Sequence, residues 1–448
     1  MARPTKLMNR NFTLLFIGQT INSLGSQGFA IAMLFWVKHE TESATLMGML
    51  MMFSSLPAIL LGPLGGVFAD RHSRRLIIIL SDAIRGISVV TLVIWMILRP
   101  EPLTPLLIWL FVVSTMVNTV GSFFTPAIIA AVPDIAPEER VNTANSLMQV
   151  SFQLSTLIGQ GIGGTVFRIL GAPILFLING VGYLLAAVLE VFITIPQVIP
   201  TEVPGCKKAL NQYLLDTREG IRYVRGRPGL RNLVLISALI NFFTVPVIML
   251  LPFYVEDVLR VYVDWYGYLI AIYGVGALIG YVISGAGRFS ARITGNLMLG
   301  FMVLESISQG ALGLTNMVQW AMALVFLGGI FSGYVTVILT TVLQLRTPKE
   351  IRGRVYSLLS TIAGAITPIA MGLSGVIADL ANHNIGLIYL VSGAIMTLLS
   401  CWIATDRAFR EFLFSPPPAD LDSSVQSEAE IATVREPVIA PEVVREER

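Results

Sequence analysis

Ionisable side chains inside long apolar runs are the residues of this chain that could do chemistry. Glu305 stands about twelve residues into one such run, and Asp82 and Arg85 lie three residues apart in another. Charged groups are costly in an apolar environment, so each is a candidate functional residue. We expect Glu305 to exchange a proton or contact a cationic group; the alternative is a neutral acid hydrogen-bonded between helices.

The other charged residues in or near apolar runs have simpler interpretations. A spacing of three puts Asp82 and Arg85 on one helix face. This favours an ion pair within that helix, or an extension of the charged loop that follows Asp70. Glu190 and Asp379 lie near the ends of their runs and are predicted to be interfacial.

That charged loop joins two apolar runs through Gly66, Asp70, Arg71, Arg74 and Arg75. A carboxylate at the C-terminal end of a helix opposes the helix dipole, so it needs nearby cations. The three arginines can supply them, and the glycine lets another backbone approach closely. The pattern predicts a packed, charged hinge at a membrane surface.

The composition specifies the kind of protein. Apolar residues make up 54% of the 448 residues, charged residues only 13%, and the mean hydropathy is +0.75. Soluble domains carry about a quarter charged residues, so we predict an all-α integral membrane protein. Twelve runs reach the length of a membrane span: 12–37, 45–69, 76–98, 103–131, 142–170, 173–195, 231–256, 264–286, 293–313, 317–345, 354–381 and 385–405.

The distribution of Lys and Arg predicts the orientation. Basic residues collect in alternate connections, including both termini and the central interval, which indicates that these are cytoplasmic. We therefore divide the chain into an N-terminal six-helix half (1–195), a cytoplasmic central loop (196–230), a C-terminal six-helix half (231–405) and a cytoplasmic tail (406–448). The second part of the loop could form an amphipathic surface helix, and we expect the tail to be disordered.

An internal repeat supports two related halves. Residues 137–147 align without a gap on 348–358, and the same register pairs Gly161 with Gly372 and Gly164 with Gly375. Both copies enter a span, the fifth and the eleventh. Parallel six-helix halves related by an axis along the membrane normal produce such a repeat.

The hinge Gly66-x-x-x-Asp70-Arg71-x-x-Arg74-Arg75 resembles the loop signature of the major facilitator superfamily between spans two and three. More narrowly, the chain looks like the branch of macrolide-efflux and siderophore (enterobactin) exporters. This rests on segments 11–19, 124–127, 144–147 and 159–164. Unlike many proton-coupled members, span four carries no basic residue.

The resemblance implies alternating access, in which two halves rock about a cavity near the membrane midplane. It also implies that Asp70 contacts the start of span eleven, here Arg352 and Arg354, and holds the cytoplasmic side shut. Spans one, four, seven and ten would line the cavity, with two and five also facing it. The polar residues we expect on the substrate pathway are Gln19, Asn22, Ser26, Gln27, Asn118, Ser122, Gln149, Gln153, Asn241 and Thr336.

These observations predict a secondary transporter of the plasma (inner) membrane that exports an amphiphilic small molecule, driven by a proton or other ion, with Glu305 as coupling candidate. Alternatives are a transporter of lysophospholipid or other lipid, and a non-transporting scaffold or sensor that uses the tail. The chain has no nucleotide-binding Gly-rich loop and no metal-ligand spacing, so we expect no enzyme activity, cofactor or metal. We expect a monomer surrounded by lipid, with no nucleic-acid partner.

Overall fold

The computed structural model describes residues 6–98, 103–197, 206–286 and 290–414, which are almost entirely helical and contain no strand. The long helices are α1 (Arg10–Thr41), α2 (Ala44–Arg71), α3 (Arg74–Leu98), α4 (Thr104–Ile135), α5 (Val141–Val191), α6 (Cys206–Arg225), α7 (Pro228–Met249), α9 (Asp264–Ala286), α10 (Ala291–Ala311), α11 (Val318–Arg346), α12 (Lys349–Leu380) and α13 (Ile385–Thr405). Shorter elements are α8 (Leu251–Phe253), a π-helical turn (Tyr254–Val258), two 3-10 turns (Glu138–Arg140, Leu312–Leu314) and α14 (Arg407–Phe414).

Ten stretches of the described chain are long and apolar enough to cross a membrane. Helix α1 is not among them because amide and hydroxyl side chains lower its hydropathy, but its 32 residues are long enough to span. Helix α5 is 51 residues long and is divided by a break, so it provides two crossings. With these two adjustments the described chain has the twelve crossings expected from the sequence.

The break in α5 occurs at Gly171. This residue has φ 74° and ψ 171°, a backbone conformation that glycine adopts and other residues rarely do. Pro173 follows, and a proline cannot continue the hydrogen-bond ladder of the preceding turn. Together they reverse the chain between the fifth crossing (141–170) and the sixth (172–191).

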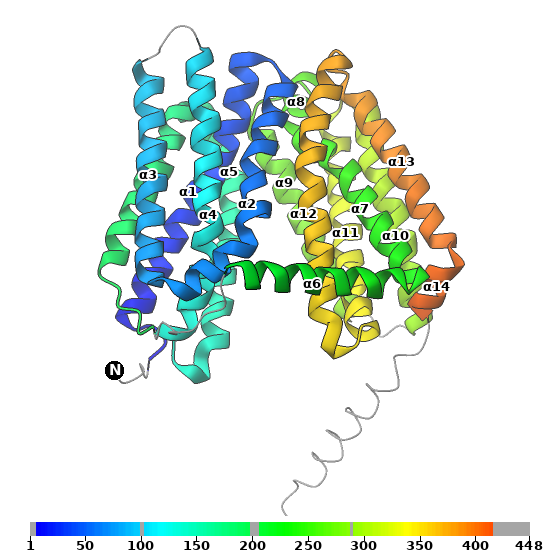
Figure 1. Ribbon diagram of the computed structural model, residues 1–448. Helices are drawn as coiled ribbons and strands as arrows, with labels where there is room; N and C mark the ends of the chain where they lie inside the picture. Colours follow the sequence, from blue (N-terminus) through cyan, green and yellow to red (C-terminus); the bar gives the residue numbers. More distant parts are fainter. Residues whose placement is uncertain (1–5, 99–102, 198–205, 287–289, 415–448) are drawn as a thin grey trace, which may run out of the picture.

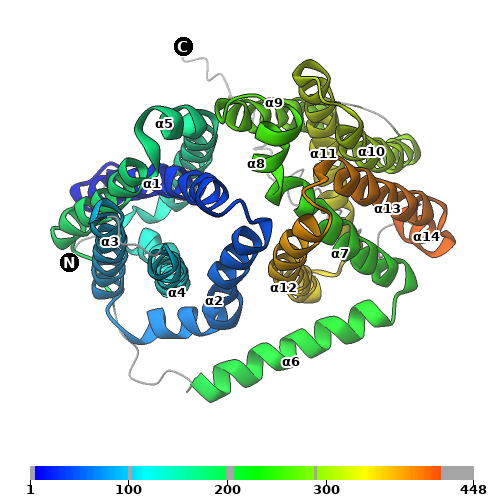
Figure 2. The ribbon, with the colours of Figure 1, turned by 90° about the horizontal axis from the view of Figure 1, so that it is seen from above.

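The crossings form two groups of helices. Helix α5 packs on α1 and α3, and α2 packs on α4, in the N-terminal half; α9, α10, α11 and α13 pack together in the C-terminal half. Seen from above, the two groups lie side by side, with α2 next to α12 and α5 next to α9 (Figure 2). The fold is an all-α membrane bundle of two halves, as the sequence predicted.

Glycines allow the two halves to approach at both of these contacts. A Cβ on Gly164 of α5 would collide with the carbonyl oxygen of Val263, just before α9. A Cβ on Gly375 of α12 would collide with the carbonyl oxygen of Ala44 at the start of α2. These two glycines are a matched pair in the internal repeat, so the repeat places small residues at equivalent positions of the two inter-half contacts.

Two helices lie outside the bundle. Helix α6 runs across one face between the halves (Figure 1), and its Gly220 packs on the backbone of Arg354 in α12. We call this the α6 face, and the face that carries residues 42–43 and 381–384 the opposite face. Helix α14 buries Phe409 and Leu413. The start of the segment expected to be a disordered tail is therefore an ordered amphipathic helix, because its apolar side chains pack on the bundle; residues 415–448 lie outside the described residues.

Candidate functional site

The N-terminal half contains a polar cavity of about 540 Å³. Helices α1 and α4 form most of its wall, and α3 and α5 complete it with Arg85, Phe152 and Tyr183. The lining mixes amides and hydroxyls with aromatic and aliphatic side chains, which suits a ligand that has both polar and apolar parts.

Five of the predicted pathway residues line this cavity: Gln19, Asn22, Ser26, Gln27 and Asn118. The four from α1 share a face because they recur at helical spacing. The hydroxyl of Ser26 lies 3.0 Å from the Tyr183 hydroxyl, and the amide of Gln27 accepts a hydrogen bond from Gln160 of α5 at 3.0 Å. These contacts hold the polar wall in place.

The other five predicted pathway residues lie elsewhere. Ser122 is buried and donates to the carbonyl of Asn118, while Gln149 and Gln153 are exposed on α5 outside the cavity lining. Asn241 accepts a hydrogen bond from Thr367, and Thr336 is exposed on α11. Their role on the pathway stays a prediction.

A buried charged cluster lies behind the cavity wall. Asp82 is fully buried; it accepts a hydrogen bond from Asn22 at 2.6 Å and pairs with Arg85 at 3.3 Å. The guanidinium of Arg85, itself 6% exposed, lies over the Phe124 ring at 4.1 Å and near the Tyr183 ring at 5.5 Å. The ion pair within α3 is present, and α1 and α4 enclose it.

Glu190 completes this cluster. Its side chain accepts a hydrogen bond from Gln19 at 3.2 Å, and Asp82 and Arg85 lie within electrostatic reach. The residue is 1% exposed, so its side chain faces the interior of the bundle although it lies at the end of its crossing. The reason is that α1 and α3 cover it, and packing between distant helices is not visible in its place along the chain.

The charged hinge on the α6 face is built mainly from contacts within the N-terminal half. Asp70 pairs with Arg74 at 3.5 Å, and Arg74 also pairs with Asp134 of α4. Arg354 pairs with Glu219 of α6 at 2.9 Å. Among the side chains that the structure describes, Asp70 therefore pairs within its own half, with Arg74.

The remaining residues predicted to form the gate donate hydrogen bonds to backbone carbonyls or lie beside the hinge. Arg75 donates to the carbonyl of Val191, and Arg352 donates to the carbonyl of Thr347 at 3.3 Å. Gly66 has open space where a Cβ would lie. Arg71 also takes part in an interaction. A gate between Asp70 and α12 stays a prediction for a state in which the α6 face is closed.

The opposite face is where the two halves are joined by charge. Lys38 at the end of α1 pairs with Glu256 at 2.6 Å and Asp257 at 2.9 Å, and His39 lies 2.9 Å from Glu256. Burial raises the pKa of the Glu256 carboxyl, but hydrogen bonds from His39 and Lys38, with their charges, outweigh it and hold that pKa below its ordinary 4.5.

Two further contacts join the halves on this face. Arg168 pairs with Asp264 at 3.0 Å, linking α5 to the start of α9. Asp379 of α12 accepts hydrogen bonds from the hydroxyl of Ser43 and the backbone of Ala44 and Thr45 at 2.8–3.0 Å. These ionic and capping contacts, here called the opposite-face latch, close that face.

The coupling candidate Glu305 lies apart from the polar cavity. It stands on α10, and Ser332 of α11 and Tyr273 of α9 lie within electrostatic reach of its carboxyl group. It is partly buried between these helices. Its coupling role and the alternative of an acid hydrogen-bonded between helices both remain predictions.

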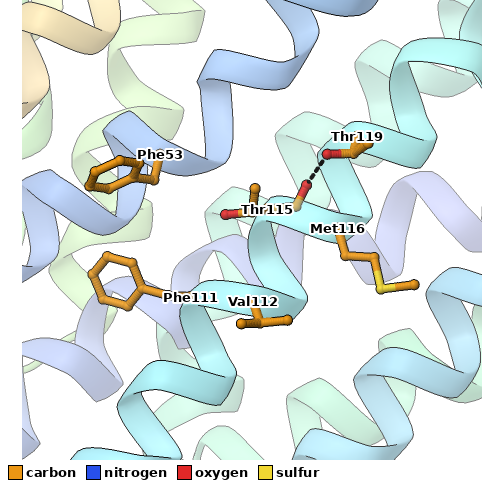
Figure 3. Close-up of a pocket in the computed structure, with 6 residues that line it drawn as sticks. All are labelled: Phe53, Phe111, Val112, Thr115, Met116 and Thr119. Carbon is orange, nitrogen blue, oxygen red and sulfur yellow. Dashed lines mark hydrogen bonds between the residues drawn. The ribbon is translucent and has the colours of Figure 1, made fainter.

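Two of the other cavities have linings that are more apolar. One of about 550 Å³ lies along α2 and α4, lined by Phe53, Phe111, Val112, Thr115, Met116 and Thr119 (Figure 3). The hydroxyl of Thr119 donates a hydrogen bond to the backbone carbonyl of Thr115 at 2.8 Å. This lining therefore has few polar groups left to bind a ligand. The other, of about 330 Å³, lies between α5, α7, α9, α10 and α11 and includes Gln160 and Gln309.

Residues 15–296 and 263–438 match the family model described as Major Facilitator Superfamily. The chain belongs to this superfamily. It is therefore a membrane-spanning transporter and not an enzyme, as the hinge signature and the two halves predicted.

Its relatives include exporters. Macrolide efflux protein A of Streptococcus pyogenes is 25% identical, with 87% of this chain and 93% of that protein covered. The multidrug efflux pump Tap of Mycolicibacterium fortuitum is 24% identical over 82% of this chain and 90% of the pump. The enterobactin exporter EntS of Shigella boydii is 26% identical, with 92% of this chain and 96% of that protein covered. These matches confirm the suspected branch.

Solved structures confirm the fold. A bacterial homologue of the human lysosomal transporter Spinster, in an inward-facing and unoccupied conformation, has a TM-score of 0.66 at 18% identity, covering 90% of this chain and 98% of that one. The nucleoside transporter NupG has the same TM-score at 11% identity, with 90% and 100% covered.

Proposed function

We propose that this transporter exports an amphiphilic small molecule by alternating access, driven by an ion gradient, and that the molecule binds in the polar cavity of the N-terminal half. The observation that carries the proposal is the lining of that cavity, in which amides of α1 and α4 face aromatic and aliphatic side chains. The efflux activity of three relatives supports the direction of transport.

The latch suggests which conformational state the structure represents. The halves are joined by charge at the opposite face, whereas at the α6 face Asp70 pairs with Arg74 of its own half among the described side chains. The Lys and Arg distribution supports a cytoplasmic α6 face, so we take this as an inward-open state. Such a state would load its cargo from the cytoplasm, as an exporter does.

Efflux of a fluorescent amphiphile from cells tests the proposal. We expect uncoupler-sensitive efflux in wild type and a loss of at least tenfold in Asn118→Leu, which puts a bulky apolar group into the cavity wall. Gln344→Leu is the matched control because Gln344 is exposed on α11 outside the lining, and it should retain wild-type efflux. Equal loss in both variants, or efflux unchanged in both, would remove the assignment of the cavity.

Lipid transport is the second candidate, and the apolar cavity along α2 and α4 favours it. Its lining would accept an acyl chain better than a polar cargo. Flux of a fluorescent lysophospholipid in proteoliposomes distinguishes the two candidates. Lysophospholipid flux that is abolished by Val112→Asp, with no flux of other amphiphiles, would favour the lipid.

A further inference from the structure

The charged cluster behind the cavity contains two carboxylates and one cation. Asp82 and Glu190 are 0% and 1% exposed, and Arg85 is 6% exposed. With both acids ionised the cluster would carry a net charge of minus one in an apolar interior, which is strongly unfavourable. One bound proton brings it to neutrality.

The hydrogen bonds indicate which carboxyl holds that proton. Asp82 has an amide donor on one oxygen and the Arg85 guanidinium on the other, as an ionised carboxylate requires. Glu190 receives one amide hydrogen bond, from Gln19, and its Oε2 is buried without a hydrogen-bond partner. An unpartnered buried oxygen is costly for a carboxylate and much less so for a neutral acid.

No second cation pairs with either acid among the described residues, and the nearby Arg75 guanidinium donates to the carbonyl of Val191 instead. The charged and titratable groups that face the cluster are Asp82 and Arg85 from α3 and Tyr183 on the same crossing as Glu190. Helix α1 contributes the amides of Gln19 and Asn22, and α4 contributes the ring of Phe124. Among the described residues around the cluster, Arg85 alone can therefore balance a carboxylate.

The position of the cluster links this proton to the cargo cavity. Arg85, Asn22 and Gln19 each touch one of the two acids and also line the cavity. At its other end, Glu190 lies one residue from Val191, where the sixth crossing ends on the α6 face. A proton on Glu190 therefore stands between that face and the cavity wall.

We infer that Asp82, Arg85 and Glu190 form a one-proton site, in which Glu190 holds the proton that couples transport to the proton gradient. This rests on the proposed function and names its coupling ion. The proton is taken up on Glu190 Oε2 from solution on one side of the membrane and returned to solution on the other. The charge of the cluster thereby changes between zero and minus one, and no other reactant is needed.

Infrared difference spectroscopy of the purified protein in lipid nanodiscs tests the site without any cargo. We expect wild type to show a protonated-carboxyl band that disappears in Glu190→Gln. The band should also disappear in Asp82→Asn, because Arg85 then neutralises an ionised Glu190. Glu305→Gln removes a different intramembrane carboxyl and should leave this band in place. Persistence of the protonated-carboxyl band in both Glu190→Gln and Asp82→Asn would overturn the inference.

Proteoliposomes then test coupling. Wild type should accelerate uptake of a fluorescent amphiphile at least fivefold when a pH gradient is imposed, whereas Asp82→Asn should show the same slow uptake with and without the gradient. Gradient-driven uptake retained in Asp82→Asn would overturn the coupling role. If wild type moved none of the probes while the infrared result held, the proposed function would fail and the proton site would stand.

Discussion

The carboxylate of Asp379 in α12 caps the first turn of α2 from across the interface between the two halves. It accepts hydrogen bonds from the backbone N–H groups of Ala44 at 2.9 Å and Thr45 at 3.0 Å. The start of α2 carries unpaired N–H groups and the positive end of a helix dipole. A carboxylate from one half therefore stabilises a helix of the other half, but only while the opposite face is closed.

Removing this cap should open the opposite face. We expect Asp379→Ala to cost the closed state about 1 kcal/mol, which shifts its population about fivefold. Distances between spin labels at Glu40 and Tyr262, in a background without Cys206 and Cys401, report the separation of the halves. Arg407→Ala breaks an ion pair within α14 and is the control. An unchanged distance distribution in Asp379→Ala would contradict the capping role.

The ion pairs of Lys38 should make the latch sensitive to strong acid. The pKa of Glu256 lies below its ordinary 4.5 in the closed state, so its contribution is present above that value. It is lost as the pH falls through the lowered pKa, when the carboxylate becomes protonated. The same spin-label pair should widen below pH 4.5, and Glu256→Gln should give the wide distribution at neutral pH as well. A distribution in Glu256→Gln that matches wild type at every pH would rule this out.

A residue larger than glycine at position 164 or 375 should hinder closure of the opposite face. A methyl group in Gly164→Ala or Gly375→Ala meets a carbonyl oxygen of the other half, and overpacking of this kind costs about 1–3 kcal/mol. We expect both variants to transport several-fold more slowly and to favour an open opposite face. Gly300→Ala is the matched control, since its Cβ would have nothing within 4 Å. Transport reduced equally in Gly300→Ala would show that added helix bulk, and not the interface, is responsible.

The hinge should form its predicted contact in the other conformational state. When the α6 face closes, we expect Asp70 to approach Arg354 at the start of α12. In the double variant Asp70→Cys/Arg354→Cys, which lacks the native cysteines, oxidative cross-linking should be slow while the latch is intact. It should become at least fivefold faster when Lys38→Ala and Glu256→Ala release the latch. Equal cross-linking rates with and without the latch would contradict alternating closure of the two faces.

The sequence predicted the elements well because each crossing carries its own signal. A run of about 20 apolar residues specifies a spanning helix regardless of its neighbours. The α1 amides were also predictable, because Gln19, Ser26 and Gln27 recur at the spacing of one helix face. The hinge was visible because its charges lie within six residues of the chain, from Asp70 to Arg75.

The contacts of the site were not predictable in the same way. Asn22 meets Asp82 across 60 residues, and Gln19 meets Glu190 across 171. Lys38 and Glu256 are 218 residues apart. Such pairs depend on which helices pack together and in what rotation, and hydropathy does not encode either. The one available signal was the cost of Asp82, Arg85 and Glu190 in an apolar run, which could have placed all three with the α1 amides.

Protection of the cavity by cargo tests the account most directly. Asn118→Cys, in a background without Cys206 and Cys401, should react with a membrane-impermeant thiol reagent supplied from the α6 face. A transported amphiphile should slow that reaction at least fivefold, while Gln344→Cys, exposed on α11 outside the lining, should react at the same rate with and without it. Protection of both cysteines, or of neither, would contradict binding of the cargo in the cavity of the N-terminal half.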